Sequence, residues 1–437
     1  MEFHNISFSQ CGKGNDNFLP ALSARNTLKV SFYSCLFEHN SCGALFLVNS
    51  DLYIEHSNFS NNSADTLYDK KLVDPNTRAF GGGIGILFYK ETRNTFVTIV
   101  HSRFVENRVS VDESPYYAAV KNLNTTVDGG AIHVTFERST FSTVINIDHC
   151  YFQQNNATFG GAVLVELYKQ SFHKSMTLYS SQFLHNYGSQ EGGSLLISRW
   201  IKSGEINLTV VDSLFKENFA KSGSAIAFLS TYGYLSPPGS KNLLLFKNLK
   251  FIGNVGPVAS AVKMAALNLG PQSSMQVPIF EDCLFAHNIN HVLNGYAFMP
   301  AFVIERIQLK FRGKNIFIGN KWYGSMYISN SIVEVHGKLH FHHNRVVKGG
   351  AVEMFHSQIV VHPGADVLFQ NNHAAFSGGA INVKTSPVNR VGDVNNKFCF
   401  LAYAEKKQSV LWNVRTFFLL FILSNLEILL LYTTVTI

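Results

Sequence analysis

Residues 145–165 read INIDHCYFQQNNATFGGAVLV, and this stretch holds one complete copy of the pattern that decides the fold. It contains the tetrapeptide Phe-x-x-Asn, at Phe152 and Asn155, and then a Gly-Gly step followed by a small and an apolar residue, at 160–163. Phe-x-x-Asn occurs eleven times, so the pattern is an internal repeat. The copies begin at Phe37, Phe59, Phe104, Phe152, Phe183, Phe215, Phe251, Phe285, Phe317, Phe341 and Phe369.

The residues around Phe152 indicate how one repeat folds. Ile145 and Ile147 alternate with polar residues, as in a strand that buries one face. His149 shares their parity but is polar, and Phe152 has the opposite parity, so we expect a corner between His149 and Phe152. We expect a second corner at Asn155, because Asn tolerates the left-handed backbone conformation, and a third at the Gly-Gly step.

The spacing of the copies favours a stack of turns. The shortest separation, from Phe37 to Phe59, is 22 residues, which suits one turn of three short strands, and the longer separations are the same turn with a loop insertion. Stacking would place Phe on Phe and Asn on Asn in continuous ladders. The sequence therefore predicts an all-β fold, a right-handed, single-stranded parallel β-helix (a solenoid) of about 11–12 coils. The leading alternative is a β-propeller or sandwich, whose antiparallel hairpins would have regularly spaced turns.

Composition limits the classes of protein that fit. Apolar residues make up 46% of the 437 residues and charged residues 15%, which favours a large core over disorder. The formal net charge of +7 comes without a Lys/Arg-rich block, so no nucleic-acid partner is predicted. The six cysteines form no Cys-x-x-Cys pair, and Cys35, Cys150 and Cys283 occupy a slot that elsewhere holds Ser, so we expect buried free thiols there.

The paired Phe-x-x-Asn and Gly-Gly-Ala-(Ile/Val/Leu) motifs resemble those of the chlamydial polymorphic outer membrane proteins. The resemblance covers roughly residues 30 to 385. It implies a β-helix exposed at a surface, in which such proteins act as passengers or adhesins. The chain departs from that family at its C-terminal end, which holds one apolar segment.

No constellation of residues predicts catalysis. Polysaccharide lyases and hydrolases on β-helices need carboxylates that converge from neighbouring coils. Glu137, Glu166 and Glu353 follow their glycine motifs at different offsets or on distant coils. Asp212 and Asp282 share a slot but lie two coils apart. We therefore predict a protein that is not an enzyme, with a polysaccharide-processing enzyme on the same scaffold as the alternative.

Three histidines are the candidates for a metal site. His56, His101 and His149 occupy the same slot on consecutive coils, and a stacked trio of imidazoles could bind a transition metal. Ser, Asp and Asn continue the slot on later coils, so a polar corner explains the histidines more readily. No metal and no cofactor are therefore predicted.

Two insertions extend from the same edge of the predicted rod. Ser63–Phe80 and Arg108–Asp128 both lie between the ladder Asn and the Gly-Gly corner. Insertions on one side of a solenoid often form its binding surface, and Tyr116 and Tyr117 are contact candidates. Asn124 begins an Asn-x-Thr sequon in the second insertion and is the glycosylation candidate. The predicted partner is a protein or glycan that binds the side faces and loops.

The chain is predicted to have three parts: a β-helix domain at 1–400, a linker at 401–415 and a hydrophobic segment at 416–437. Phe417–Ile437 is long enough to form a membrane-spanning helix, although Glu427 is costly in lipid. It could instead cap the open end of the solenoid. No signal peptide is recognised, and the chain could be a fragment. The predicted function is a membrane-associated or extracellular scaffold for adhesion or interaction at the cell surface.

Overall fold

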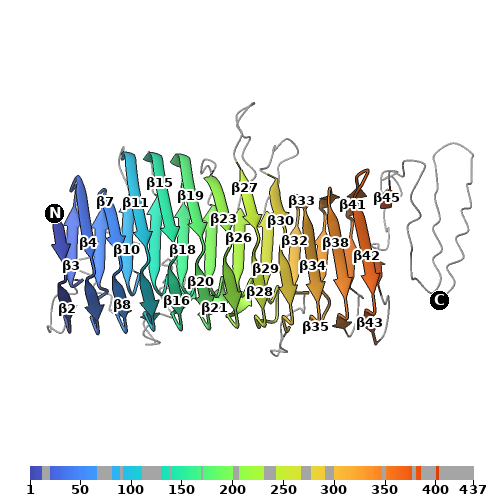
Figure 1. The fold of residues 1–437 in the computed structure, drawn as a ribbon, viewed down its shortest axis with the longest axis horizontal. Coiled ribbons are helices and arrows are strands. Elements are labelled where there is room, and N and C mark those ends of the chain that lie inside the picture. The colour runs from blue at the N-terminus through green and yellow to red at the C-terminus, as the bar shows by residue number, and fades with distance from the viewer. Residues whose placement is uncertain are drawn as a thin grey trace, which may run out of the picture.

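The computed structural model describes residues 1–11, 20–65, 81–88, 92–110, 129–136, 140–168, 171–199, 206–230, 243–266, 277–290, 300–346, 351–375, 380–384 and 400–402. These residues contain strands and no helix. The strands stack along the long axis of a rod, and the chain advances steadily from one end of the rod toward the other (Figure 1).

One coil shows how the sequence pattern becomes structure. It runs through β15 (Thr140–Asp148), β16 (Tyr151–Gln153), β17 (Asn156–Phe159) and β18 (Val163–Leu167). The chain turns at three residues with positive φ: His149 at 49°, Gln154 at 54° and Gly160 at 59°. The corners at the polar slot and at the Gly-Gly step are therefore confirmed.

The prediction that the ladder Asn itself adopts the left-handed conformation is wrong. The residue before it does so, as at Gln154, and Asn155 is fully buried. Turning the backbone one residue earlier points the Asn side chain into the rod, where its amide bonds to neighbouring coils. The left-handed residue points outward, so His39 and His185, which occupy this position, are exposed.

Three long parallel sheets form the sides of the rod. Sheet A has 13 strands in the order β1 (Glu2–His4), β4 (Lys29–Tyr33), β7 (Asp51–Glu55), β11 (Arg93–Val100), β15, β19 (Ser171–Tyr179), β23 (Ile206–Val211), β27 (Leu244–Lys247), β30 (Pro278–Glu281), β33 (Gln308–Arg312), β37 (Ile332–Val335), β41 (Gln358–Val361) and β45 (Phe400–Ala402). Sheet B has 12 strands in the order β2 (Ser7–Ser9), β5 (Leu36–Glu38), β8 (Asn58–Ser60), β12 (Arg103–Val105), β16, β20 (Gln182–Leu184), β24 (Leu214–Lys216), β28 (Lys250–Ile252), β31 (Leu284–Ala286), β34 (Lys314–Ile318), β38 (Lys338–His342) and β42 (Asp366–Gln370).

Sheet C also has 12 strands, in the order β3 (Leu22–Arg25), β6 (Leu45–Val48), β10 (Ile84–Phe88), β14 (Ile132–Phe136), β18, β22 (Leu195–Arg199), β26 (Ile226–Ser230), β29 (Val262–Ala266), β32 (Phe302–Glu305), β36 (Met326–Ser329), β40 (Val352–Phe355) and β44 (Ile381–Lys384). Two short sheets lie between the ladder Asn and the Gly-Gly corner. One contains β25 (Phe219–Ser222), β21 (Tyr187–Glu191), β17, β13 (Arg108–Ser110) and β9 (Ser63–Asp65), and the other contains β35 (Lys321–Trp322), β39 (Arg345–Val346) and β43 (His373–Ala374).

The strand pairing places equivalent residues directly above one another. Phe104 pairs with Phe59 on one side and with Phe152 on the other, and these pairings are parallel. Along the whole Phe column, from Phe8 to Phe369, neighbouring ring centroids lie 4.3–5.3 Å apart in stacked geometry. These features confirm the right-handed parallel β-helix and exclude the hairpins of a propeller or sandwich.

The Asn column forms a second ladder from Asn40 to Asn372. Each Nδ2 donates to the Oδ1 of the next Asn at 2.7–3.1 Å. Each also reaches a Phe carbonyl oxygen of the preceding coil, as Asn107 Nδ2 reaches that of Phe59 at 2.8 Å. The ladder thus supplies partners to amides that would be costly to bury alone.

The expected Ser/Cys slot is a third ladder. The Ser181 hydroxyl accepts the Cys150 backbone N–H at 3.1 Å and donates to the Tyr179 carbonyl at 2.8 Å. Cys35, Cys150 and Cys283 are free and buried in this slot, as predicted. Burial raises the pKa of Cys150 to about 12, which keeps its thiol protonated.

The predicted division into 1–400, 401–415 and 416–437 stays a prediction, because residues 403–437 lie outside the described residues. In the described ranges we find no helix with the length and apolarity needed to span a bilayer.

Candidate functional site

The predicted histidine trio lies at one corner of the rod, between sheets A and B. The ring centroids of His56 and His101 are 5.0 Å apart, and those of His101 and His149 are also 5.0 Å apart. All three residues are exposed and have positive φ. His149 Nδ1 lies 2.7 Å from the Asp148 carboxylate, so the trio is partly engaged in local pairs. That the trio is a polar corner without a metal stays the prediction, and metal binding by the trio stays its untested alternative.

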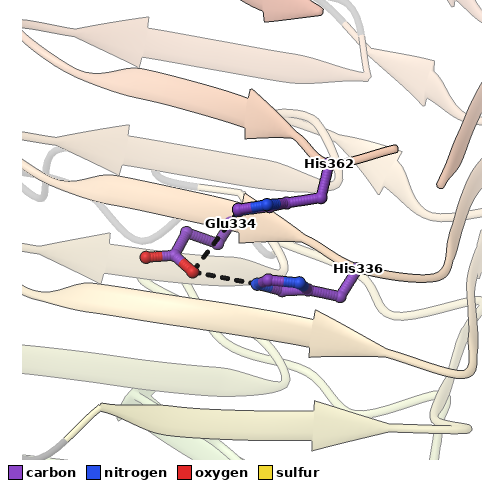
Figure 2. A group of neighbouring side chains, drawn as sticks. All are labelled: Glu334, His336 and His362. Atoms are coloured by element: carbon purple, nitrogen blue, oxygen red, sulfur yellow. Dashed lines mark hydrogen bonds and ion pairs between the residues drawn. The ribbon is translucent and has the colours of Figure 1, made fainter. Parts of the chain in front are cut away.

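A different set of side chains brings metal-ligating atoms together on the outer face of sheet A. Among the described residues, the group of three or more His, Cys, Asp or Glu whose ligand atoms all lie within 4.8 Å of one another is Glu334, His336 and His362. Figure 2 shows the Glu334 carboxylate beside the two stacked imidazoles, with a dashed line from the carboxylate to each ring. We call these three residues the EHH cluster.

The parallel register of two neighbouring coils creates this cluster. Val335 in β37 pairs with Val361 in β41, which places His336 next to His362 immediately after the two strands. The backbone N–H of His362 donates to the Val335 carbonyl at 2.9 Å and holds the backbone of this second histidine in place. Glu334 lies two residues before His336 and therefore points to the same side of the sheet.

The Glu334 carboxylate is the centre of the cluster. Its Oε2 atom lies 2.9 Å from His336 Nε2, 3.6 Å from His362 Nε2 and 3.0 Å from Lys310 Nζ. Gln308 Nε2 donates to Oε1. The two imidazole rings stack with centroids 3.8 Å apart and 16° between their planes. The buried His362 Nε2 atom makes no hydrogen bond.

Electrostatics keep the carboxylate ionised. Burial raises the pKa of Glu334, but hydrogen bonds from His336, Lys310 and Gln308 outweigh burial and lower the pKa to about 2. An ionised carboxylate beside two imidazole nitrogens is a ligand set suited to Zn²⁺, Ni²⁺ or Cu²⁺.

Our sequence reasoning missed this cluster because it considered only the slots near Phe-x-x-Asn. A signal was present: SIVEVH at 331–336 and SQIVVH at 357–362 align Ser with Ser and His with His. Ser331 and Ser357 stack in the structure, since the Ser331 N–H donates to the Ser357 hydroxyl at 3.1 Å. This alignment would have predicted adjacent histidines.

The acidic residues considered for catalysis lie apart. Asp212 and Asp282 flank Asn248 at one corner, and Asn248 Nδ2 donates to Asp212 Oδ1 at 2.6 Å. Glu166 is buried on sheet C, where its Oε2 atom lies 3.1 Å from His133 Nε2. This contact joins the neighbouring strands β14 and β18, and removing either side chain would remove one polar contact between them. Glu137 lies outside the described residues.

A group of cations lies on the outer surface near the C-terminal end of the described coils. Lys314 pairs with Lys338 across β34 and β38, and Lys321 pairs with Arg345 across β35 and β39. All four side chains belong to exposed residues, and none forms an ion pair with a described residue. We call Lys314, Lys321, Lys338 and Arg345 the basic surface.

The expected loop contacts cannot be placed. Asn124, Tyr116 and Tyr117 lie outside the described residues, as does most of the Ser63–Phe80 insertion.

The coil that contains His362 also carries the recognisable repeat. Residues 366–384 match the Chlamydia polymorphic membrane protein (Chlamydia_PMP) repeat. The matched stretch begins with β42, which contains Phe369 of the Phe column, and ends with β44. The Pmp repeat therefore lies within one coil of this β-helix, and the resemblance noted in the sequence is confirmed. No curated protein and no solved structure matches the chain.

Proposed function

We propose that this protein is a non-enzymatic β-helix that acts as an adhesion or interaction scaffold at the cell surface or outside the cell. The Pmp repeat supports a surface role, because it is a repeat of surface-associated proteins and not an enzymatic domain. The architecture supports a binding role, because a solenoid offers a long, rigid side face on which side chains repeat at the strand spacing of about 4.8 Å.

One observation supports a class of ligand: like charges stack on paired strands in the basic surface. Lys314 over Lys338 and Lys321 over Arg345 place cations directly opposite on paired strands, which is destabilising in the absence of an anion. Asp366 lies opposite Lys338 on the following strand, but its carboxylate contacts His340 Nε2 at 2.8 Å and forms no ion pair with Lys338. We infer that the partner is a linear acidic glycan whose repeated anionic groups follow the rungs.

Binding of polygalacturonate and heparin to the full chain tests this proposal. We expect binding that weakens as salt rises, because exposed charges are screened. The double substitution K338Q/R345Q removes two contacts of up to about 1 kcal/mol each and should weaken binding about tenfold. Lys216→Gln is the matched control, since Lys216 is a half-buried cation on the same sheet as Lys338 and already pairs with Glu217.

The same experiment separates the scaffold from the enzyme alternative. Polymer that keeps its length after long incubation agrees with a scaffold, whereas shortened polymer would favour a polysaccharide-processing enzyme. Equal binding by K338Q/R345Q and the parent chain would remove the basic surface from the proposal.

Association with a membrane through residues 416–437 remains part of the proposal. The full chain should then float with lipid vesicles, and a chain ending at residue 415 should stay in the aqueous fraction. Equal flotation of the two chains would contradict anchoring by this segment.

A further inference from the structure

We propose that Glu334, His336 and His362 form a binding site for one divalent transition-metal ion, with Zn²⁺ and Ni²⁺ as the natural probes. The site would supply two imidazole nitrogens and one carboxylate oxygen, with the remaining positions open to water or to a ligand group. It lies on sheet A, separate from the basic surface on sheet B and the short sheet beside it.

The spacing of the ligand atoms suits such an ion. In a tetrahedral zinc site with bonds of 2.0–2.1 Å, neighbouring ligand atoms lie about 3.3 Å apart. Glu334 Oε2 lies 2.9 Å from His336 Nε2 and 3.6 Å from His362 Nε2, so the two observed separations bracket that value. The parallel rings would need to turn toward a common point, and the broad χ2 torsion of His permits this change.

The present arrangement also leaves an unmet requirement that an ion would satisfy. His362 Nε2 is buried and has no hydrogen-bond partner, although it points toward the Glu334 carboxylate in Figure 2. A buried ring nitrogen without a partner costs free energy. The Nε2 atoms of both histidines face the same carboxylate oxygen, from rings whose centroids are 3.8 Å apart. A metal ion would use one lone pair from each ring.

Lys310 is the competing cation. Its Nζ atom lies 3.0 Å from Glu334 Oε2, so an incoming metal ion must share or displace this contact. The alternative explanation of the cluster is therefore an ion-pair network of Lys310, Glu334 and one protonated histidine. The two explanations differ in the effect of removing Lys310. If the cluster binds a metal ion, removing Lys310 should strengthen metal binding. If the cluster is only an ion-pair network, removing Lys310 should lower the stability of the fold.

The test is isothermal titration of the chelator-treated full chain with Zn²⁺ and Ni²⁺. We expect saturable binding that weakens at least about tenfold in His336→Ala, His362→Ala and Glu334→Gln, because each removes a ligand. Lys310→Met should bind the ion more tightly than the parent chain. His101→Ala, in the exposed histidine trio, is the matched control and should leave binding unchanged.

Three outcomes would overturn the site. Binding that survives in both His336→Ala and His362→Ala would place the ion elsewhere, and loss of binding in His101→Ala would assign it to the trio. Absence of saturable binding in both the parent chain and Lys310→Met, with Lys310→Met less stable, would support the ion-pair network. Circular dichroism of each variant shows whether the strands persist, and Lys310→Met tests the site even if a histidine variant fails to fold.

Discussion

At the scale of single residues, the ladder Asn shows why one side chain type recurs in this slot. Asn218 donates through Nδ2 to the Phe183 carbonyl and to Asn254 Oδ1, both at 3.0 Å. Its own Oδ1 accepts the N–H and the Nδ2 of Asn186 at 2.9 and 3.0 Å. Only a side chain that carries a donor and an acceptor of amide geometry can serve the coils on both sides.

Asn218→Ala should therefore destabilise the fold. It leaves the Asn186 backbone N–H and one of the two N–H bonds of the Asn186 amide without their acceptor, at a cost of about 1–3 kcal/mol for each buried group. Chemical denaturation measures the free energy of unfolding. Lys216→Ala, two residues away and outside the ladder with a half-buried side chain, is the control and should change it little. Equal stability of the two variants would contradict the role of the ladder.

A buried lysine provides a test by pH. Lys174 is 1% exposed inside the rod, with Nζ 3.5 Å from Thr143 Oγ1 and 5.1 Å from the centre of the Phe136 ring. Burial lowers its pKa to about 7 from 10.5. Between these values the unfolded chain binds the proton and the folded chain does not, so stability rises with pH across this window.

We expect the contribution of Lys174 to the free energy of unfolding to rise by about 1.4 kcal/mol per pH unit between pH 7 and 10.5. Lys174→Met should remove this pH dependence and raise the free energy of unfolding at pH 7, because no charge has to be neutralised on folding. Denaturation of both proteins across this range measures the difference. Parallel pH profiles would show that Lys174 keeps an ordinary pKa in the fold.

At the scale of the element, the Gly-Gly corner is set by the close approach of neighbouring coils. A Cβ atom on Gly161 would lie within 3.0 Å of the backbone carbonyl oxygens of Gly193 and Tyr187. Backbone atoms in a stacked coil cannot move aside without breaking the strand pairing on both sides. The second glycine is thus required by packing between coils, whereas the first, Gly160, is required by its φ of 59°.

Gly161→Ala should cost about 3 kcal/mol, as overpacking in a close-packed interior does. Gly253→Asn is the control. Gly253 has a φ of 61°, which Asn tolerates, and a Cβ there would meet only Glu217 Cγ at 3.4 Å. Thermal unfolding of both variants tests the difference. A Gly161→Ala chain that melts with the parent would show that the corner can relax.

At the scale of the whole molecule, each coil contacts mainly its two neighbours, so coupling should be short-ranged. Asn186→Ala and Asn218→Ala remove partners in one hydrogen bond of 3.0 Å, and their effects on stability should not add. Asn62 lies four rungs from Asn218 in the ladder, so Asn62→Ala and Asn218→Ala should add to within about 0.5 kcal/mol.

Double-mutant cycles measured by denaturation compare these pairs. Strong coupling between the distant pair would mean that the rod unfolds through contacts other than those of adjacent coils. Additive effects of the adjacent pair on the free energy of unfolding would mean that the hydrogen bonds between the Asn side chains act independently.

The repeated residues by themselves determined the architecture. Phe152, Asn155 and Gly161 each perform a task that recurs in every comparable coil, so their pattern predicts the corners, the ladders and the parallel stack. Only the tertiary structure decided that one Glu334 oxygen lies near both histidines of the EHH cluster, that Lys174 is buried and that the cations of the basic surface stack. These features depend on which residues lie opposite one another in successive coils. Insertions of unequal length change the sequence separation between such residues, but they do not change which residues pair in the structure.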